Sequence, residues 1–308
     1  MTRQPRQKGQ GRNSGHQLHS KNQIQQNAQT GGHRTQNKRH RKIRKCLLPN
    51  HSGQHLLHHP PTIREMVAMP RLTADETVLD IGAGAGALTF LLAETAGHVI
   101  AVEQDEAFVQ TLREKAQAYP NLKVVHGDFR TIKLPERPFA VVANLPFSIT
   151  TPIFEKLLGP EGVGFRRGAF LIERGAAVRF TSGAAGDAKV LAWRMNHDIT
   201  LCRTVPRTHF APPPRVDAAI VYVQARREPL VPPGQYRRFC AFAGFVLRHG
   251  GLPLHVPLSA VFTAGQLGRA LREAGAGRDQ PAGTLNVMQW SALFRAMTKH
   301  VPPHRWPR

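Results

Sequence analysis

The chain has 308 residues, of which 41% are hydrophobic, enough for one large domain and a smaller one. Its 42 Lys and Arg against 20 Asp and Glu give a net charge of +22, which favours a polyanionic partner. No apolar run approaches the roughly 20 residues of a membrane span, and the amino terminus lacks the apolar core of a secretory signal. Cys46, Cys202 and Cys240 are far apart, which argues against a disulfide framework or a zinc site. We therefore expect a soluble, cytoplasmic protein without a bound metal.

A basic arm occupies residues 1–45. It carries twelve Lys or Arg and no acidic residue, a composition that cannot bury a core and predicts disorder. The arm ends in the run KRHRKIRK, in which Lys42, Arg44 and Lys45 are candidates to contact RNA phosphates. An inert solubilising tail and a mitochondrial transit peptide are the alternatives.

From Thr77 onward, short apolar runs alternate with helical patterns, which predicts an α/β fold with a largely parallel sheet. We expect helices between the first five strands and again before the sixth. The segment that joins the last two strands is too short and too rich in proline for a helix, so these strands should form an antiparallel hairpin. The predicted strands are residues 77–82, 98–103, 123–128, 139–144, 168–173, 199–205 and 218–225.

Only helices are expected after residue 228. Apolar residues recur at helical spacing in 235–250, Thr263 and Gln266 fit a capping box that opens a helix over 264–275, and 287–300 is amphipathic. The sequence thus predicts a catalytic domain over 46–228 and a helical RNA-binding domain over 229–308.

A glycine-rich turn follows the first predicted strand. Gly82, Gly84 and Gly86 allow a tight turn that approaches a ligand closely, beside a helix amino terminus. Gly82, Gly84 and Ala87 also fit the dinucleotide pattern G-x-G-x-x-A, so a dehydrogenase is a competing hypothesis. A purely structural turn is the third possibility.

Acidic residues at the next strand ends define the expected ligand rim. Glu103 ends the second strand, 21 positions after Gly82, where a carboxylate can accept hydrogen bonds from a ribose diol. Asp128 ends the third strand and suits an adenine amino group, and Asp80 in the first strand is a candidate partner for a ligand ammonium. Both NAD and S-adenosylmethionine carry such a diol.

The motif Asn144-Leu145-Pro146-Phe147 follows the fourth strand and reaches the same rim. Its Pro146 lacks an amide donor, which leaves the Asn144 side-chain oxygen and the Leu145 carbonyl as acceptors. Two such acceptors can hold a planar exocyclic amine and favour its attack on a sulfonium methyl, while Phe147 stacks on the base. The competing interpretation is a strand-end turn with a buried phenylalanine.

These motifs resemble the rRNA adenine N6-dimethyltransferases, and among them the Erm methyltransferases that protect the large ribosomal subunit from macrolides, lincosamides and streptogramin B. The resemblance runs from about Ser52 to the carboxyl terminus. The run SGQHLL is similar to the family's S-Q-N-F-[IL] segment, which covers the methionine end of the cofactor, so Gln54, His55 and Leu57 are implied cofactor residues. The run HFAPPPRVDAA resembles a second family signature and makes Phe210 the second aromatic near the target base. His55 stands where Asn is usual.

The resemblance implies a Rossmann-like class I methyltransferase sheet, S-adenosyl-L-methionine as cofactor and 23S rRNA, protein-free or in a precursor particle, as the partner of a monomeric enzyme. The alternatives are the housekeeping relative that dimethylates adenines of 16S rRNA, and a non-catalytic nucleic-acid-binding factor. RNA is expected to present an extruded or looped adenine. The arginines expected to contact RNA around the cleft are Arg174, Arg179, Arg207 and Arg215.

Overall fold

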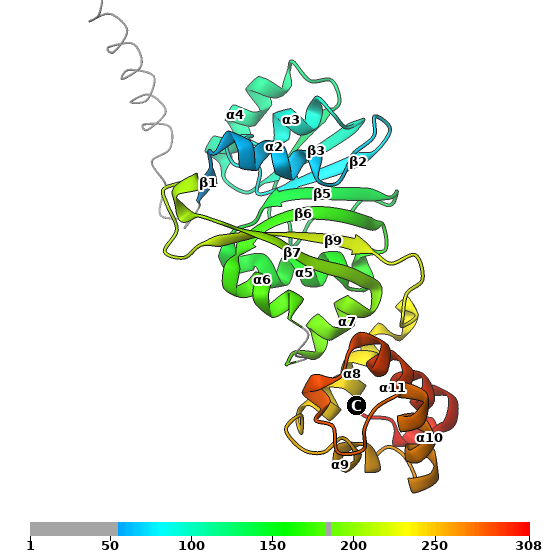
Figure 1. Ribbon diagram of the computed structural model, residues 1–308. Helices are drawn as coiled ribbons and strands as arrows, with labels where there is room; N and C mark the ends of the chain where they lie inside the picture. Colours follow the sequence, from blue (N-terminus) through cyan, green and yellow to red (C-terminus); the bar gives the residue numbers. More distant parts are fainter. Residues whose placement is uncertain (1–54, 183–185) are drawn as a thin grey trace, which may run out of the picture. The chain divides into compact units, whose positions relative to one another are not determined.

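A computed structural model of the chain describes residues 55–182 and 186–308 (Figure 1). The predicted disorder of residues 1–45 and the predicted contacts of Lys42, Arg44, Lys45 and Gln54 therefore lie outside the described residues.

A seven-stranded sheet forms the centre of the fold, with the strand order β4-β3-β2-β5-β6-β9-β7. The strands from β4 to β6 in this order are parallel to one another, and β9 pairs antiparallel with both β6 and β7. The expected parallel sheet and terminal hairpin are thus confirmed. The strands are β2 (Thr77–Ile81), β3 (His98–Glu103), β4 (Leu122–His126), β5 (Phe139–Asn144), β6 (Phe165–Glu173), β7 (His197–Val205) and β9 (Ala218–Ala225).

Helices cover both faces of the sheet, which explains why its central strands are apolar throughout rather than alternating. Val142 of β5 packs in a cluster with α2 and α3, whereas Val141 and Ala143 pack in a second cluster with α5, α6 and α7. Figure 1 shows these two groups of helices on opposite sides of the strands. The helices are α2 (Pro60–Ala68), α3 (Thr89–Ala93), α4 (Glu106–Ala116), α5 (Thr150–Leu158), α6 (Arg174–Thr181) and α7 (Ala188–Asn196).

The prediction of a helix between β4 and β5 is wrong, because residues 127–138 form turns and irregular structure. Pro135 and Pro138 interrupt this short connection, and proline cannot donate within a helix. The ammonium group of Lys156 instead donates to the carbonyls of Phe129, Arg130 and Ile132. One cation from α5 therefore satisfies backbone acceptors that a helix would have paired.

Four helices follow the sheet: α8 (Tyr236–Leu247), α9 (His255–Ser259), α10 (Ala264–Ala274) and α11 (Val287–His300). The capping box of Thr263 and Gln266 is present as predicted, whereas the short α9 was not expected. These helices share a core with Leu191 and Met195 of α7, so the domain division at residue 228 stays a prediction. Among the described residues, no helix is both long and apolar enough to cross a bilayer.

A second, two-stranded sheet lies beside the first and was not predicted. It pairs β1 (Leu56–Leu57) antiparallel with β8 (Phe210–Ala211). Leu57 and Phe210 are buried in the cluster that also contains Val142 of the main sheet. The small sheet thereby attaches the residues just before α2 to the main sheet, close to the end of β5.

Candidate active site

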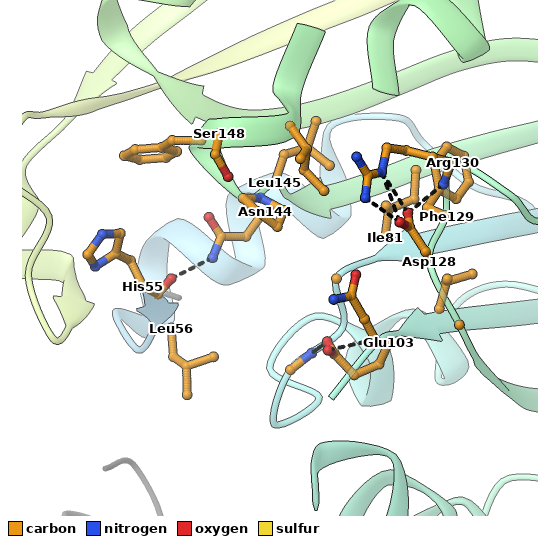
Figure 2. A pocket seen from close by; sticks show the side chains of 18 residues that line it. His55, Leu56, Ile81, Glu103, Asp128, Phe129, Arg130, Asn144, Leu145 and Ser148 are labelled. Atoms are coloured by element: carbon orange, nitrogen blue, oxygen red, sulfur yellow. Dashed lines mark hydrogen bonds and ion pairs between the residues drawn. The ribbon is translucent and has the colours of Figure 1, made fainter. Parts of the chain in front are cut away.

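A pocket opens at the carboxyl ends of the central strands (Figure 2). Most of the predicted site residues meet there although they come from separate segments of the chain. The pocket is lined by His55 and Leu56 around the start of β1, Gly82 and Gly84 after β2, Glu103 at the end of β3, Asp128 after β4, and Asn144, Leu145, Pro146 and Phe147 after β5.

The glycine turn has the backbone conformation that its sequence predicted. Gly82, Gly84 and Gly86 all have positive φ, at 71°, 53° and 85°, where a side chain would be strained. A Cβ on Gly84 would also lie 2.8 Å from Cδ2 of Leu56. The turn thus brings bare backbone against the pocket, as close ligand approach requires.

The carboxylate of Glu103 is buried and fixes this turn. Oε2 accepts a 2.7 Å hydrogen bond from the Gly84 amide, and Oε1 accepts bonds of 2.8 Å from the Gln104 and Asp105 amides. The side chain is only 3% exposed. Since a carboxylate offers about four acceptor positions, roughly one remains for a ligand hydroxyl. Acceptance of both ribose hydroxyls, as expected from the sequence, would require one backbone bond to give way.

Asp128 lines the pocket, but its carboxylate is already paired with Arg130. Hydrogen bonds from the Arg130 side chain hold the pKa of Asp128 below its ordinary value. The pair keeps a negative acceptor at the rim across the ordinary pH range. Its predicted contact with an adenine amino group stays a prediction, and Arg130 is a lining residue that was not foreseen.

The Asn144 amide has a defined orientation. Its Nδ2 donates a 2.9 Å hydrogen bond to the backbone carbonyl of His55, as the dashed line in Figure 2 shows. The donor side of the amide is therefore occupied, and Oδ1 remains on the other side as an acceptor. Leu145 is buried, whereas Phe147 is half-buried and keeps part of its ring accessible. The motif thus places an amide oxygen and an aromatic side chain at the pocket, and the roles expected of them stay predictions.

Two residues implied by the resemblance do not line the pocket. Leu57 is 5% exposed and Phe210 is 2% exposed, and both belong to the apolar cluster beneath the small sheet. Side chains alternate along a strand, so Leu56 rather than Leu57 faces the pocket. The expected contacts of Leu57 with the cofactor and of Phe210 with the target base stay predictions, which the burial of both side chains does not favour.

Asp80 also lies outside the pocket lining, in contrast to its expected contact with a ligand ammonium. It is 1% exposed, and its Oδ2 accepts a 2.6 Å hydrogen bond from the Thr89 hydroxyl. Among the described residues, Oδ1 has no hydrogen-bond partner. Burial raises the pKa of Asp80 to about 7, the Thr89 bond opposes this rise, and the Glu103 carboxylate adds to it.

We predict that Asp80→Asn stabilises the protein increasingly as the pH rises. The folded state binds the Asp80 proton more tightly than the unfolded state, so the cost of ionisation is absent below pH 4 and is complete above about pH 7. The difference in unfolding free energy between variant and parent should grow by a few kcal/mol between pH 5 and pH 8. Urea titrations at both pH values measure it, and a constant difference would contradict the raised pKa.

The four arginines expected to contact RNA are exposed. Three of them gather around Asp217. The backbone amide of Arg174 donates to the Asp217 carbonyl, the backbone amide of Arg207 donates to the Asp217 carboxylate, and Arg215 precedes Asp217 by two residues. Asp217 lies where β6, β9 and β7 end or begin, at the same edge of the sheet as Asn144. Arg179 donates to the Thr151 hydroxyl at the start of α5. Their contact with RNA stays a prediction.

A family model described as "Ribosomal RNA adenine dimethylase" matches residues 49–299, which is most of the chain. The chain belongs to the ribosomal RNA adenine dimethylase family. It is therefore a methyltransferase that modifies rRNA adenine at N6 and uses S-adenosylmethionine. The dehydrogenase and the non-catalytic binding factor are excluded.

Individual relatives agree with this family assignment. The rRNA adenine N-6-methyltransferase of Bacillus licheniformis is 40% identical over 270 residues, 88% of this chain and 94% of the relative. The ribosomal RNA small subunit methyltransferase A of Listeria monocytogenes is 34% identical over 197 residues, 60% of this chain and 66% of the relative. The crystal structure of the 23S rRNA methyltransferase ErmE has a TM-score of 0.70 and 28% identity, and it is matched over 79% of this chain and 100% of its own.

The pocket offers the groups that the family's cofactor requires. Bare backbone at Gly84 can lie against the ligand, and the buried Glu103 carboxylate has an acceptor position left at the end of β3. Phe129 and Ser148, which sequence reasoning missed, complete the lining on the Asp128 and Phe147 sides. Each directly follows a predicted site residue, so adjacency was the signal that could have identified them.

Proposed function

We propose that this member of the ribosomal RNA adenine dimethylase family methylates N6 of a specific adenine in 23S rRNA and thereby confers resistance to macrolides, lincosamides and streptogramin B. The modification is mono- or dimethylation. We further propose that the enzyme acts in the cytoplasm as a monomer, on protein-free or precursor rRNA.

The extent of similarity supports this target. The likeness to the 23S rRNA methyltransferase ErmE takes in the whole of that chain and 79% of this one. The likeness to the small-subunit enzyme spans only 60% of this chain. The small-subunit 16S rRNA adenine dimethyltransferase is therefore the second candidate, supported by that partial alignment.

The proposed chemistry starts from the weak nucleophilicity of the adenine amine, whose lone pair is delocalised into the ring. When bound, S-adenosylmethionine supplies an electrophilic methyl group on a sulfonium centre. Asn144 Oδ1 and the Leu145 carbonyl accept hydrogen bonds from the two N–H groups of the amine, hold the nitrogen in line and favour its pyramidal form. Because these acceptors also stabilise the positive charge that develops on the nitrogen, no base is needed before methyl transfer. Water can take the proton afterwards.

We predict that Phe147→Ala lowers kcat/KM for RNA roughly 10- to 100-fold, since stacking of a base on an aromatic ring contributes about 1–3 kcal/mol. Phe147→Tyr keeps a stacking surface and should lose little. Phe147 is half-buried and lines the pocket, where this contact would be made. Steady-state kinetics of both variants provide the comparison, and equal losses for Ala and Tyr would refute stacking.

The proposed target is tested by methylation of protein-free 23S and 16S rRNA in parallel with labelled S-adenosylmethionine, followed by primer extension to locate the modified base. We expect one strong stop in the drug-binding loop of 23S rRNA. Label confined to 16S rRNA would transfer the enzyme to the small-subunit group. The alanine variant of Asn144 is the control for contaminating methyltransferases.

A further inference from the structure

His55 lies directly before β1 and contacts the Asn144 amide through its backbone. We propose that His55 is a positioning residue for methyl transfer, which orients the Asn144 amide through its own carbonyl and keeps that carbonyl in place through its ring. This inference rests on the acceptor role proposed for Asn144. It concerns a position where this chain departs from the usual Asn of the S-Q-N-F-[IL] segment.

The direction of the His55 carbonyl follows from the pairing of β1 with β8. In an antiparallel pair, the backbone groups of every second residue point toward the partner strand, and those between point away. The His58 amide donates to the His209 carbonyl at 3.0 Å, so Leu56, two residues earlier, points its backbone groups toward β8 as well. The carbonyl of His55 must then point away from β8, where Asn144 Nδ2 meets it.

The small sheet alone holds β1 weakly. Within the described residues β1 pairs only with β8, over two residues. The ring of His55 adds a tie beyond the end of the pairing, because its Nδ1 lies 2.9 Å from the Pro212 carbonyl oxygen. Since a carbonyl only accepts, Nδ1 carries the proton in this bond. The ring thereby fixes the residue whose carbonyl faces the catalytic amide.

Rotation of the Asn144 amide by 180° would place Oδ1 against the His55 carbonyl. Two acceptors would then meet, and Nδ2 instead of Oδ1 would face the site proposed for the target amine. The bond from Asn144 to His55 therefore selects the rotamer in which the acceptor is available. Displacement of the carbonyl removes this selection without removing any group that touches the target.

Three substitutions at position 55 separate the ring donor from ring volume. His55→Ala removes both, His55→Phe keeps a ring without the donor, and His55→Asn places an amide nitrogen at the topological position of Nδ1. We expect Ala and Phe to lower the single-turnover rate constant roughly 10- to 100-fold, as small losses of alignment do, with little change in the KM for S-adenosylmethionine. His55→Asn should restore most of the rate.

The matched control is His58→Ala, three residues along the same segment, where the side chain is exposed and only the backbone pairs with His209. Its rate should equal that of the parent enzyme. Full activity of His55→Phe would overturn the proposal, as would a raised KM for S-adenosylmethionine at an unchanged rate constant, which would make His55 a direct cofactor contact. If His55→Ala fails to fold, the comparison of Phe with Asn still decides.

A second measurement needs neither RNA nor turnover. The side-chain ¹H–¹⁵N signals of Asn144, assigned by their loss in Asn144→Asp, should shift and exchange faster with water in His55→Phe, and they should return toward parent values in His55→Asn. Unchanged signals in His55→Phe would overturn the proposal. The single-turnover rate constants of variant and parent are compared on total rRNA, which contains both 23S and 16S rRNA. Methylation of 16S instead of 23S rRNA would therefore refute the proposed target and leave this inference standing.

Discussion

Asn144→Ala is expected to lower the rate constant of methyl transfer on the order of 10³-fold, because it removes the side-chain acceptor aimed at the charge that develops on the amine. Its Oδ1 has no hydrogen-bond partner within residues 55–182 and 186–308, and the nitrogen of the same amide is held by His55. Single-turnover methylation of rRNA with labelled S-adenosylmethionine measures the loss. Turnover close to that of the parent enzyme would rule out the hydrogen-bonding role.

Two controls accompany this variant. The affinity for S-adenosylhomocysteine, measured by calorimetry, should change little, since Gly84 and Glu103 are untouched. The melting temperature should also stay close to the parent value, because Asn144 is only partly buried and its side chain makes one hydrogen bond to the described part of the chain, to a backbone carbonyl. A large loss of either would mean that Asn144 supports the pocket rather than the reaction.

Glu103→Ala is expected to produce the largest combined loss of stability and cofactor affinity. The substitution leaves the buried amide of Gly84 and the part-buried amides of Gln104 and Asp105 without their acceptor. A buried orphan costs about 1–3 kcal/mol, whereas the two part-buried amides can bind water instead, so the free energy of unfolding should fall by roughly 1–3 kcal/mol. Loss of the charged acceptor for a ligand hydroxyl should weaken S-adenosylhomocysteine binding by a further factor of about 10 to 100.

Glu103→Gln provides the matched comparison. Its amide oxygen can still accept from the Gln104 and Asp105 amides, but its NH₂ group would face the Gly84 amide, donor against donor. The glutamine variant should therefore lose less stability than the alanine variant. It should nevertheless bind the cofactor more weakly than the parent enzyme does. A folded alanine variant that binds S-adenosylhomocysteine as tightly as the parent would contradict the role of the carboxylate.

Much of the sheet could be predicted because its central strands are short apolar runs, buried on both faces and separated by clear turn signals. β3, β5 and β9 have the predicted limits. Pro135 and Pro138 could have shown that no helix joins β4 to β5. The acceptor pairing that replaces the helix could not be predicted, because it comes from Lys156, a residue of α5. β1 and β8 were missed for a related reason, since two-residue strands have no periodicity.

The site was predicted best where residues end strands. Parallel strands bring their carboxyl ends to one edge, so Gly82, Glu103, Asp128 and Asn144 could be placed together from the order of the motifs alone. Side-chain direction could not be obtained this way. Leu57 and Phe210 belong to matching motifs, yet their side chains turn into the core because of a strand pairing that local patterns do not reveal.

The pairing of β1 with β8 also has a consequence for protein synthesis. Leu56 and its partner Ala211 are far apart in the chain, and at about 5–20 residues per second the ribosome needs roughly 8–30 s to make the segment between them. The strands β2 to β6 can pair during this interval. The segment with His55 and β1 cannot take its place at the pocket until β8 has been made. The nascent chain can thus pair its five parallel strands before its pocket forms, whereas β9, which joins β6 to β7, is made only after β8. A chain released before β8 would hold Asn144 without the segment that anchors β1.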